Sequence, residues 1–246
     1  MSQDGGSTED LRAYPSGTVN VSFQHDILSP SKSSDTSTPD RPTRLHVSLR
    51  NVCYDEATKQ SEAKQLFHVI DKHRAHLREW LPWLDFVKKF EDQFFFLEKT
   101  SCEGKAKKSF VQVIEVREEE TAAPVIAGTC SFNFVDHERK IGYVGYWLSK
   151  EFAGLGLMTK CVEKLVQFGE KEFQLQHFDI SCAVGNLKSQ KVAGKLDGFL
   201  KLEGVKDVVK LYGVEHELMS FVRTVVEKPD YSAREARKDF QVRDLM

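Results

Sequence analysis

The sequence of 246 residues lacks the usual marks of a secreted, membrane-spanning or metal-binding protein. Its five cysteines are odd in number and widely spaced, with no Cys-x-x-Cys pair, so we expect neither a disulfide framework nor a zinc site. No apolar run approaches the roughly 20 residues that cross a bilayer. The N-terminus also lacks the charged start and apolar stretch of a secretory signal. We therefore expect a cytoplasmic protein with reduced thiols and no membrane or metal partner.

An excess of charge of either sign is also missing. The net charge is −2, which gives no global electrostatic reason to expect binding to nucleic acid. The glycine-bearing loop near residue 155 has no Gly-Lys-Ser/Thr, which disfavours a P-loop nucleotide hydrolase. With 40% hydrophobic and 29% charged residues, the composition is that of a globular protein.

Composition divides the chain into three parts. Residues 1–42 are rich in Ser, Thr, Asp, Pro and Gly and cannot bury enough apolar surface to offset their ordering entropy, so disorder is expected. A short alternating run at 19–23 is a candidate strand within this part. Residues 43–225 form the folded domain, and residues 226–246 form a charged C-terminal tail.

Hydrophobic periodicity predicts a mixed order of elements within the domain. A strand from Thr43 is followed by helices at 60–80 and 88–99, strands at 109–116, 124–135 and 141–148, a helix at 156–173, a strand at 178–184, a helix at 187–196, and strands at 199–208 and 214–225. This order predicts an α/β (α+β) domain whose mixed central sheet, of about seven strands, is flanked by helices.

The most informative stretch joins the strand at 141–148 to the helix at 156–173. Gly154 and Gly156 precede a helical pattern whose first turn has backbone N–H groups without intrahelical partners. Because glycine permits close approach and the helix dipole is positive at this end, the stretch is suited to holding a phosphate or pyrophosphate.

Three motifs carry a resemblance to a known family. They are His76-Leu77-Arg78-Glu79-Trp80-Leu81-Pro82-Trp83, then Gly145-Tyr146-Trp147-Leu148 with Gly154-x-Gly156-Leu157-Met158-Thr159, then Asn186-x-x-Ser189-x-x-Val192-Ala193. Together with the order of elements, they resemble the GNAT N-acetyltransferases, and in particular the RimJ/RimL branch of ribosomal-protein N-terminal acetyltransferases. The resemblance covers residues 43–225.

The resemblance implies an N-acetyltransferase that passes the acetyl group of acetyl-CoA directly to a primary amine, on a protein N-terminus or a small molecule. It also implies roles for particular residues. The pantetheine arm would be held by the backbones of Trp147, Leu148 and Ser149, and the pyrophosphate by Gly154, Leu155, Gly156, Leu157, Met158 and Thr159. The Leu148 N–H would stabilise the oxyanion, and Ser189 would donate to the leaving thiolate. Asn186 would contact the arm or cap its helix, and Trp80 and Trp83 would wall the acceptor pocket or pack in the core.

Several positions depart from the family pattern. Ala153 and Leu155 stand where polar or basic side chains are common, and Asp197 is an extra residue after the last helix. Tyr143 occupies the place of a Glu, and with an ordinary pKa of about 10 a tyrosine is a poor base. Asp136, His137, Glu138 and His216 remain as substitutes for that base. These departures motivate a second hypothesis, a degenerate acyl-CoA-binding or protein-interaction module. Both a monomer and a homodimer are left open.

Overall fold

The computed structural model describes residues 21–27, 43–52, 55–118, 121–204 and 207–225, and the structural statements below concern these residues. Nine strands form a sheet with the order β1-β2-β3-β4-β5-β6-β9-β7, and β8 pairs with β9. The strands are β1 (Val21–Ile27), β2 (Thr43–Asn51), β3 (Phe110–Arg117), β4 (Val125–Asp136), β5 (Ile141–Leu148), β6 (His177–Ala183), β7 (Leu200–Lys201), β8 (Val208–Leu211) and β9 (Val214–Thr224).

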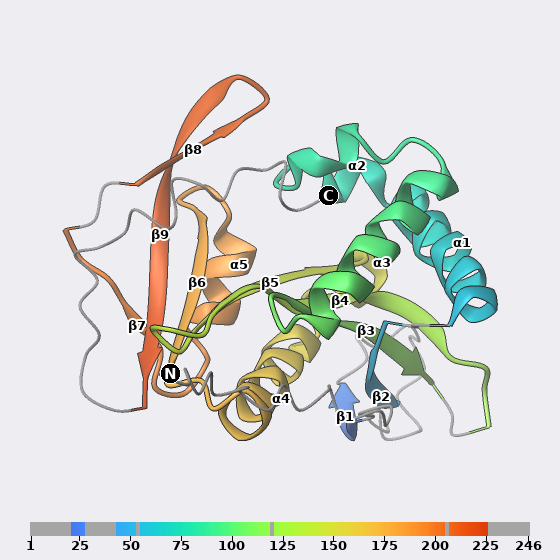
Figure 1. Ribbon diagram of the computed structural model, residues 1–246, viewed down its shortest axis with the longest axis horizontal. Coiled ribbons are helices and arrows are strands. Elements are labelled where there is room, and N and C mark those ends of the chain that lie inside the picture. The colour runs from blue at the N-terminus through green and yellow to red at the C-terminus, as the bar shows by residue number, and fades with distance from the viewer. Residues whose placement is uncertain (1–20, 28–42, 53–54, 119–120, 205–206, 226–246) are drawn as a thin grey trace, which may run out of the picture.

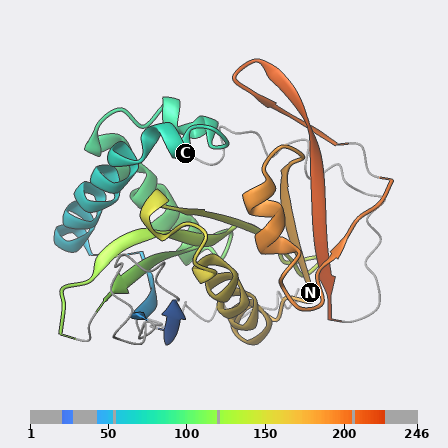
Figure 2. The same ribbon diagram turned by 180° about the vertical axis from the view of Figure 1, so that it is seen from behind.

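Helices cover both faces of the sheet, as Figure 1 and the reverse view in Figure 2 show. On one face lie α1 and α3, and on the other lie α4 and α5. The helices are α1 (Glu56–Lys72), α2 (Arg74–Leu77), α3 (Phe90–Lys105), α4 (Leu157–Glu172) and α5 (Leu187–Ala193), with short 3-10 turns η1 (Pro82–Asp85) and η2 (Lys150–Phe152). No described helix is long and apolar enough to span a bilayer.

Strand β3 shows how the sequence builds a core on both faces. Its side chains alternate in direction, so Phe110 and Ile114 pack toward α4 while Val111 and Val113 pack toward α1 and α3. All four are buried. A strand that is apolar on both faces can lie only in the middle of a sheet covered on both sides, and β3 occupies such a position.

Helix α4 buries the stripe that the periodicity predicted. Leu157, Met158, Cys161, Val162 and Leu165 are buried against the sheet, and charged residues occupy the other side. The helix begins after Gly156, whose φ of +81° is in the left-handed region, which glycine adopts without a steric penalty. The sequence thus fixes both the buried face of α4 and the point where the helix begins.

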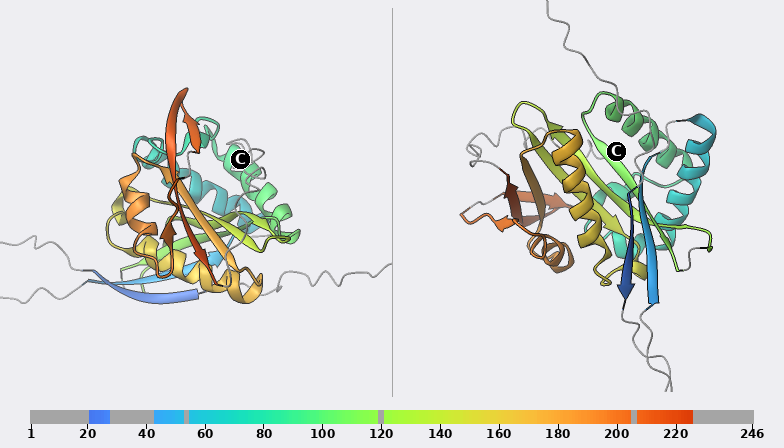
Figure 3. Two further views of the ribbon diagram at one scale, coloured as in Figure 1. Left: turned by 90° about the vertical axis from the view of Figure 1, so that its left-hand side faces the viewer. Right: turned by 90° about the horizontal axis from the view of Figure 1, so that it is seen from below.

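Strand β1 corrects the expected disorder for part of the N-terminal segment. Val21–Ile27 forms an edge strand antiparallel to β2, with Phe23 opposite Val47, and Figure 3 shows the two strands side by side. The described part of the alternating run predicted at 19–23, from Val21 to Phe23, therefore lies in an ordered strand. The other residues between 1 and 42, and the tail at 226–246, lie outside the described residues.

Two other expectations need correction. The helix expected at 60–80 spans Glu56–Lys72 and is followed by the separate α2. The Arg74 guanidinium on α2 donates hydrogen bonds to the carbonyls of Leu84 and Val87, at 2.9 and 2.8 Å. The strand expected at 199–208 is instead the two-residue β7 and the separate β8, and with β1 this raises the number of strands from about seven to nine. The extra residue Asp197 lies in a turn after α5, in which Gly198 adopts a φ of +74°.

The pairing of β5 with β6 positions the functional site. These two strands are parallel and joined by α4, and their pairing runs from Ile141 opposite His177 to Val144 opposite Ile180. Beyond that point β5 continues to Leu148 and β6 to Ala183 without pairing to each other. Figure 1 shows the two strands running in different directions, with α5 beside the space that they leave.

Phe132 provides a test of the core. Its side chain is fully buried, with ring centroids of Phe173 and Phe178 at 6.2 and 5.9 Å. Replacing Phe132 by Ala should lower the free energy of unfolding by about 3–5 kcal/mol, because it leaves a cavity between the sheet and α4. Urea denaturation measures the loss. The matched control is Phe95→Ala on α3, since Phe95 is 64% exposed and its loss should leave stability almost unchanged.

Candidate functional site

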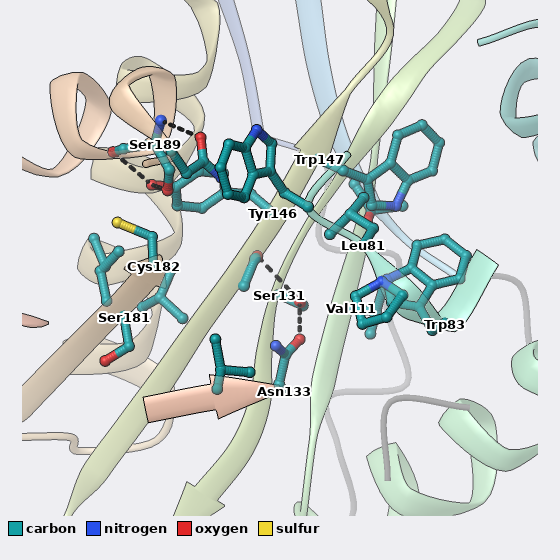
Figure 4. Close-up of a pocket in the computed structure, with 18 of the residues that line it drawn as sticks. Leu81, Trp83, Val111, Ser131, Asn133, Tyr146, Trp147, Ser181, Cys182 and Ser189 are labelled. Atoms are coloured by element: carbon teal, nitrogen blue, oxygen red, sulfur yellow. Dashed lines mark hydrogen bonds between the residues drawn. The ribbon is translucent and has the colours of Figure 1, made fainter. Parts of the chain in front are cut away.

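A cleft of about 290 Å³ opens where β5 and β6 separate, and Figure 4 shows the residues around it. The labelled side chains come from both halves of the sheet, from α5 and from the turn after α2. On one side lie Tyr146, Cys182 and Ser189, and on the other lie Trp83 and Trp147. The cleft therefore brings together the second and third sequence motifs and the aromatic end of the first.

Ser189 and Tyr146 form the hydroxyl pair of the cleft. The Tyr146 Oη atom lies 2.9 Å from Ser189 Oγ and 3.2 Å from the Ser189 carbonyl oxygen. Ser189 sits in the first turn of α5, where its backbone N–H donates to Asn186 Oδ1 at 3.1 Å. Asn186 is therefore the N-cap of α5, and it fixes the position of Ser189 at the edge of the cleft.

The titratable groups beside this pair are held neutral. Burial raises the pKa of the Tyr146 phenol, and the hydrogen bond with Ser189 opposes the rise only in part. Burial also raises the pKa of the Cys182 thiol next to Ser189. Both groups therefore stay protonated at neutral pH, so Tyr146 is a neutral hydrogen-bond donor and Cys182 is not a thiolate.

The floor of the cleft is a polar side-chain network on β4. Ser131 Oγ donates to Asn133 Oδ1 at 2.7 Å and also lies 3.1 Å from the Gly145 carbonyl oxygen on β5. A side chain at position 145 would meet the Asn133 amide, because a Cβ placed there would lie 2.2 Å from Asn133 Nδ2. The glycine that begins the second motif therefore makes room for Asn133 in the cleft.

The end of β5 presents alternating backbone groups to its two sides. The Ser149 N–H donates to the Ala127 carbonyl of β4 at 2.7 Å. Because N–H groups alternate between the two edges of a strand, the Leu148 N–H points to the other edge, toward the gap left by β6. This geometry agrees with the role expected for Leu148. The Ser149 N–H is already bound within the sheet, and the role expected for Ser149 stays a prediction.

The loop before α4 has the shape expected of an anion site. Gly154 and Gly156 both have left-handed φ values, of +85° and +81°. A Cβ at Gly154 would have no atom within 4 Å, so the space beside that residue is open. In the first helical turn the side chains of Leu157 and Met158 are buried, and only Thr159 adds a partly exposed hydroxyl. The loop can thus bind a ligand mainly through backbone N–H groups.

Positive charge gathers at the open end of the gap. Burial lowers the pKa of the His76 imidazole, and the nearby charges of Lys188 and Lys150 lower it further, while Glu79 acts in the opposite direction. Lys150 directly follows β5 and Lys188 lies in the first turn of α5. Two lysines thus lie near the gap, which suits an anionic ligand.

Trp80 and Trp83 line the cleft and also pack within the protein. The Trp80 ring lies against Gly185, where a Cβ would come within 2.8 Å of the ring, and it meets the His216 ring edge to face at 6.2 Å. Trp83 lies partly buried against a small apolar cluster that includes Ile70 and Leu84. Packing within the protein is therefore observed for both side chains, and their role as walls of the acceptor pocket stays a prediction.

A second contact crosses the mouth of the cleft. Tyr212, at the turn between β8 and β9, donates a hydrogen bond from its hydroxyl to the Arg78 carbonyl. The Arg78 guanidinium lies 4.1 Å from the centre of the Tyr212 ring and binds both carboxylate oxygens of Asp85. This clasp of Arg78, Tyr212 and Asp85 ties the β8–β9 hairpin to the turn after α2.

The structure separates most of the expected bases from the cleft. The turn between β4 and β5 carries Asp136, His137 and Glu138, at the opposite end of β5 from Leu148. The expectation that one of them is the general base is therefore wrong. Tyr143 does not line the cleft, and its ring packs against Phe134 with centroids 5.8 Å apart. Of these candidates, His216 is the one placed at the mouth of the cleft.

The sequence reasoning missed several residues. Tyr146 was named only as part of a motif, although alternation along β5 would have directed it to the face opposite Trp147, toward α5. Asn133 and Ser131 carry no motif, since polar residues within a strand are common. His25 on β1 contacts the glycine loop, with its Nε2 atom 2.7 Å from the Leu155 carbonyl oxygen, and no sequence signal connects residues 130 positions apart.

Comparison with known proteins agrees with this site. Residues 56–198 match the sequence profile of the family described as "Acetyltransferase (GNAT) domain". The Escherichia coli protein named "Ribosomal-protein-serine acetyltransferase" is 26% identical over 167 residues, which are 63% of this chain and 88% of that protein. A Bacillus subtilis protein named "Putative ribosomal N-acetyltransferase YdaF" is 32% identical over 96 residues, 39% of this chain and about half (52%) of its own length.

Solved structures show the same likeness. The microcin C7 self-immunity acetyltransferase MccE, crystallised with acetyl-CoA and AMP, is 26% identical with a TM-score of 0.60, and the match covers 72% of this chain and 92% of that chain. The ribosomal-protein-S5-alanine acetyltransferase of Vibrio fischeri is 25% identical with a TM-score of 0.61, covering 74% and 96%. The fold and the class of reaction expected from the sequence are thereby confirmed.

The clasp at the cleft mouth generates a prediction. Tyr212→Ala removes a hydrogen bond and a cation–π contact, together worth about 1–2 kcal/mol. The amide groups of β8 should therefore exchange with deuterium about tenfold faster, while those of β6 keep their rate. Val214→Ala is the matched control, because Val214 lies in the same hairpin and is exposed. Unchanged exchange in Tyr212→Ala would show that the clasp does not hold the hairpin.

Proposed function

This chain belongs to the GNAT acetyltransferase family, and we propose that it transfers the acetyl group of acetyl-CoA to the α-amino group of a protein N-terminus. The observation that carries the proposal is the gap between β5 and β6, which is flanked by the glycine loop of α4 and by the hydroxyl pair of Ser189 and Tyr146. The glycine loop, the free edge of β5 and the hydroxyl pair thus offer groups for the pyrophosphate, the pantetheine arm and the thioester of acetyl-CoA, respectively.

The residues present fit acetyl-CoA. The pantetheine arm has amide groups that can pair with the free edge of β5 at Leu148, as an added strand does. The N–H groups between Gly154 and Thr159 would receive the pyrophosphate, and Lys150 and Lys188 add positive charge nearby. Ala153 and Leu155 contribute no polar side chain, so affinity depends on the backbone of the loop.

The same residues supply the chemistry of direct transfer. The acceptor amine attacks the thioester carbonyl, and the Leu148 N–H is placed to stabilise the oxyanion of the tetrahedral intermediate. The thiolate of coenzyme A then leaves and takes up the proton that the amine loses, and Ser189 Oγ is the group that passes on this proton or donates a hydrogen bond to the thiolate. Tyr146 supports Ser189, because its neutral phenol can donate to Ser189 Oγ.

Cys182 is the other nucleophile beside this pair, and its environment argues against an acyl-enzyme. Burial raises the pKa of its thiol, so the reactive thiolate is scarce at neutral pH. Acetyl transfer therefore proceeds in one ternary complex, without a covalent intermediate on Cys182.

The acceptor is inferred from relatives and from the shape of the mouth. Two relatives are named for acetylating ribosomal proteins, at a serine in one case and at the alanine of S5 in the other. Here Trp80, Trp83 and the β8–β9 hairpin frame an aromatic opening on the acceptor side. A ribosomal-protein N-terminus encountered in the cytoplasm fits this arrangement.

The proposal is tested with peptides that begin with Ser or Ala. Release of free coenzyme A thiol should be seen with a free peptide N-terminus and should vanish when the same peptide is blocked at its α-amino group. A panel of small amines serves as the comparison. Binding of coenzyme A without turnover on any amine would instead support the degenerate binding module.

Ser189→Ala should lower kcat by about 100-fold or more, because the leaving thiolate loses its donor. Tyr146→Phe should lower kcat by about tenfold through loss of one supporting hydrogen bond. Steady-state kinetics with acetyl-CoA and a peptide measures both. The matched control is Cys182→Ala, which alters the neighbouring side chain and should retain activity. A Cys182→Ala variant as inactive as Ser189→Ala would contradict direct transfer.

A further inference from the structure

Strand β1 brings a histidine to the glycine loop from the far edge of the sheet. His25 is partly buried, and its Nε2 atom lies 2.7 Å from the Leu155 carbonyl oxygen. Its Cε1 and Nε2 atoms also lie 3.7 Å from the point that a Cβ on Gly156 would occupy. The imidazole thus packs directly on the peptide unit between Leu155 and Gly156.

This contact fixes the orientation of that peptide unit. A peptide bond is planar and trans, so its carbonyl and its N–H point in opposite directions. Because the Leu155 carbonyl accepts a hydrogen bond from His25, the Gly156 N–H is directed away from His25. In the flipped orientation, the carbonyl oxygen would take the place of this N–H, and it would repel an anion.

The loop needs such a restraint because its own residues do not supply one. Gly154 and Gly156 flank Leu155, and glycine passes easily between the conformations that a peptide flip requires. Ala153 and Leu155 have no polar side chain to bind a phosphate. Anion binding therefore depends on backbone N–H groups whose directions must be held from outside the loop.

We propose that His25 is a positioning residue for the donor substrate, which holds the Leu155–Gly156 peptide with its N–H toward the pyrophosphate of acetyl-CoA. The inference rests on the proposed function, since it assigns the ligand of the loop. It makes β1 part of the site, although β1 belongs to a segment whose composition predicts disorder. His25 touches neither the thioester nor the acceptor amine.

The test compares two acetyl donors with the full chain. Acetyl-CoA carries the pyrophosphate, whereas acetyl-pantetheine has the same thioester and lacks it. His25→Ala should raise KM for acetyl-CoA about tenfold with kcat nearly unchanged, and it should leave kcat/KM for acetyl-pantetheine unaltered. His25→Gln, whose amide can still donate to the Leu155 carbonyl, should recover much of the loss. Gln24→Ala is the matched control, because Gln24 is the exposed neighbour on the same strand.

Each result separates this inference from the function on which it rests. Equal losses with both donors, or no change with either, would overturn the role of His25 while wild-type turnover still supports the acetyltransferase. Titration calorimetry with coenzyme A provides a second readout that needs no turnover. Weaker binding of coenzyme A by His25→Ala in a chain that acetylates nothing would support the positioning role and overturn the proposed function. Absence of coenzyme A binding in the wild-type chain would overturn both.

Discussion

The separation of β5 from β6 is the constraint on which the rest of the structure depends. Two parallel strands joined by a helix normally pair along their length, but here the pairing ends at Val144 and Ile180. Beyond that point the Tyr146 side chain of β5 contacts Ser189 on α5, which follows β6, so a side-chain hydrogen bond and not a backbone ladder connects the two halves of the sheet there. Backbone groups on the free edge of β5 need a partner other than a strand. The same crossover places the start of α4 at the end of β5, so the strand edge and the anion site arise from one connection.

A sheet that opens in the middle must be held together elsewhere. Continuous pairing of the first halves of β5 and β6 provides one link, and the packing of α4 beneath both strands provides another. At the open end, Trp80 lies against Gly185 and the clasp of Arg78, Tyr212 and Asp85 ties the hairpin to the turn after α2. These contacts join the two halves around the cleft, which keeps its walls in place without closing the gap.

The parts of the fold with strong periodicity were predictable from the sequence. Strand β5 and helix α4 begin and end within a residue or two of the expected bounds, because burial on one face dictates their patterns. The strand expected at 199–208 was wrong, since an apolar run does not show where the chain leaves a sheet.

Ser189 and the glycine loop were found through motifs. His25 was beyond sequence reasoning, because its contact joins two segments through a register that only the folded sheet defines.

The positions of the candidate bases bear on the identity of the acceptor. An amine must be neutral to attack a thioester, yet Asp136, His137 and Glu138 lie at the far end of β5 and Tyr143 packs against Phe134. An α-amino group has a pKa of about 8, so roughly one molecule in ten is already neutral at pH 7, whereas a lysine side chain with a pKa of about 10.4 is neutral in fewer than about one molecule in a thousand. An α-amino acceptor therefore needs far less help from a general base, such as His216 beside Trp80, than a lysine or a polyamine does. This difference in pKa supports the proposed protein N-terminus as the acceptor.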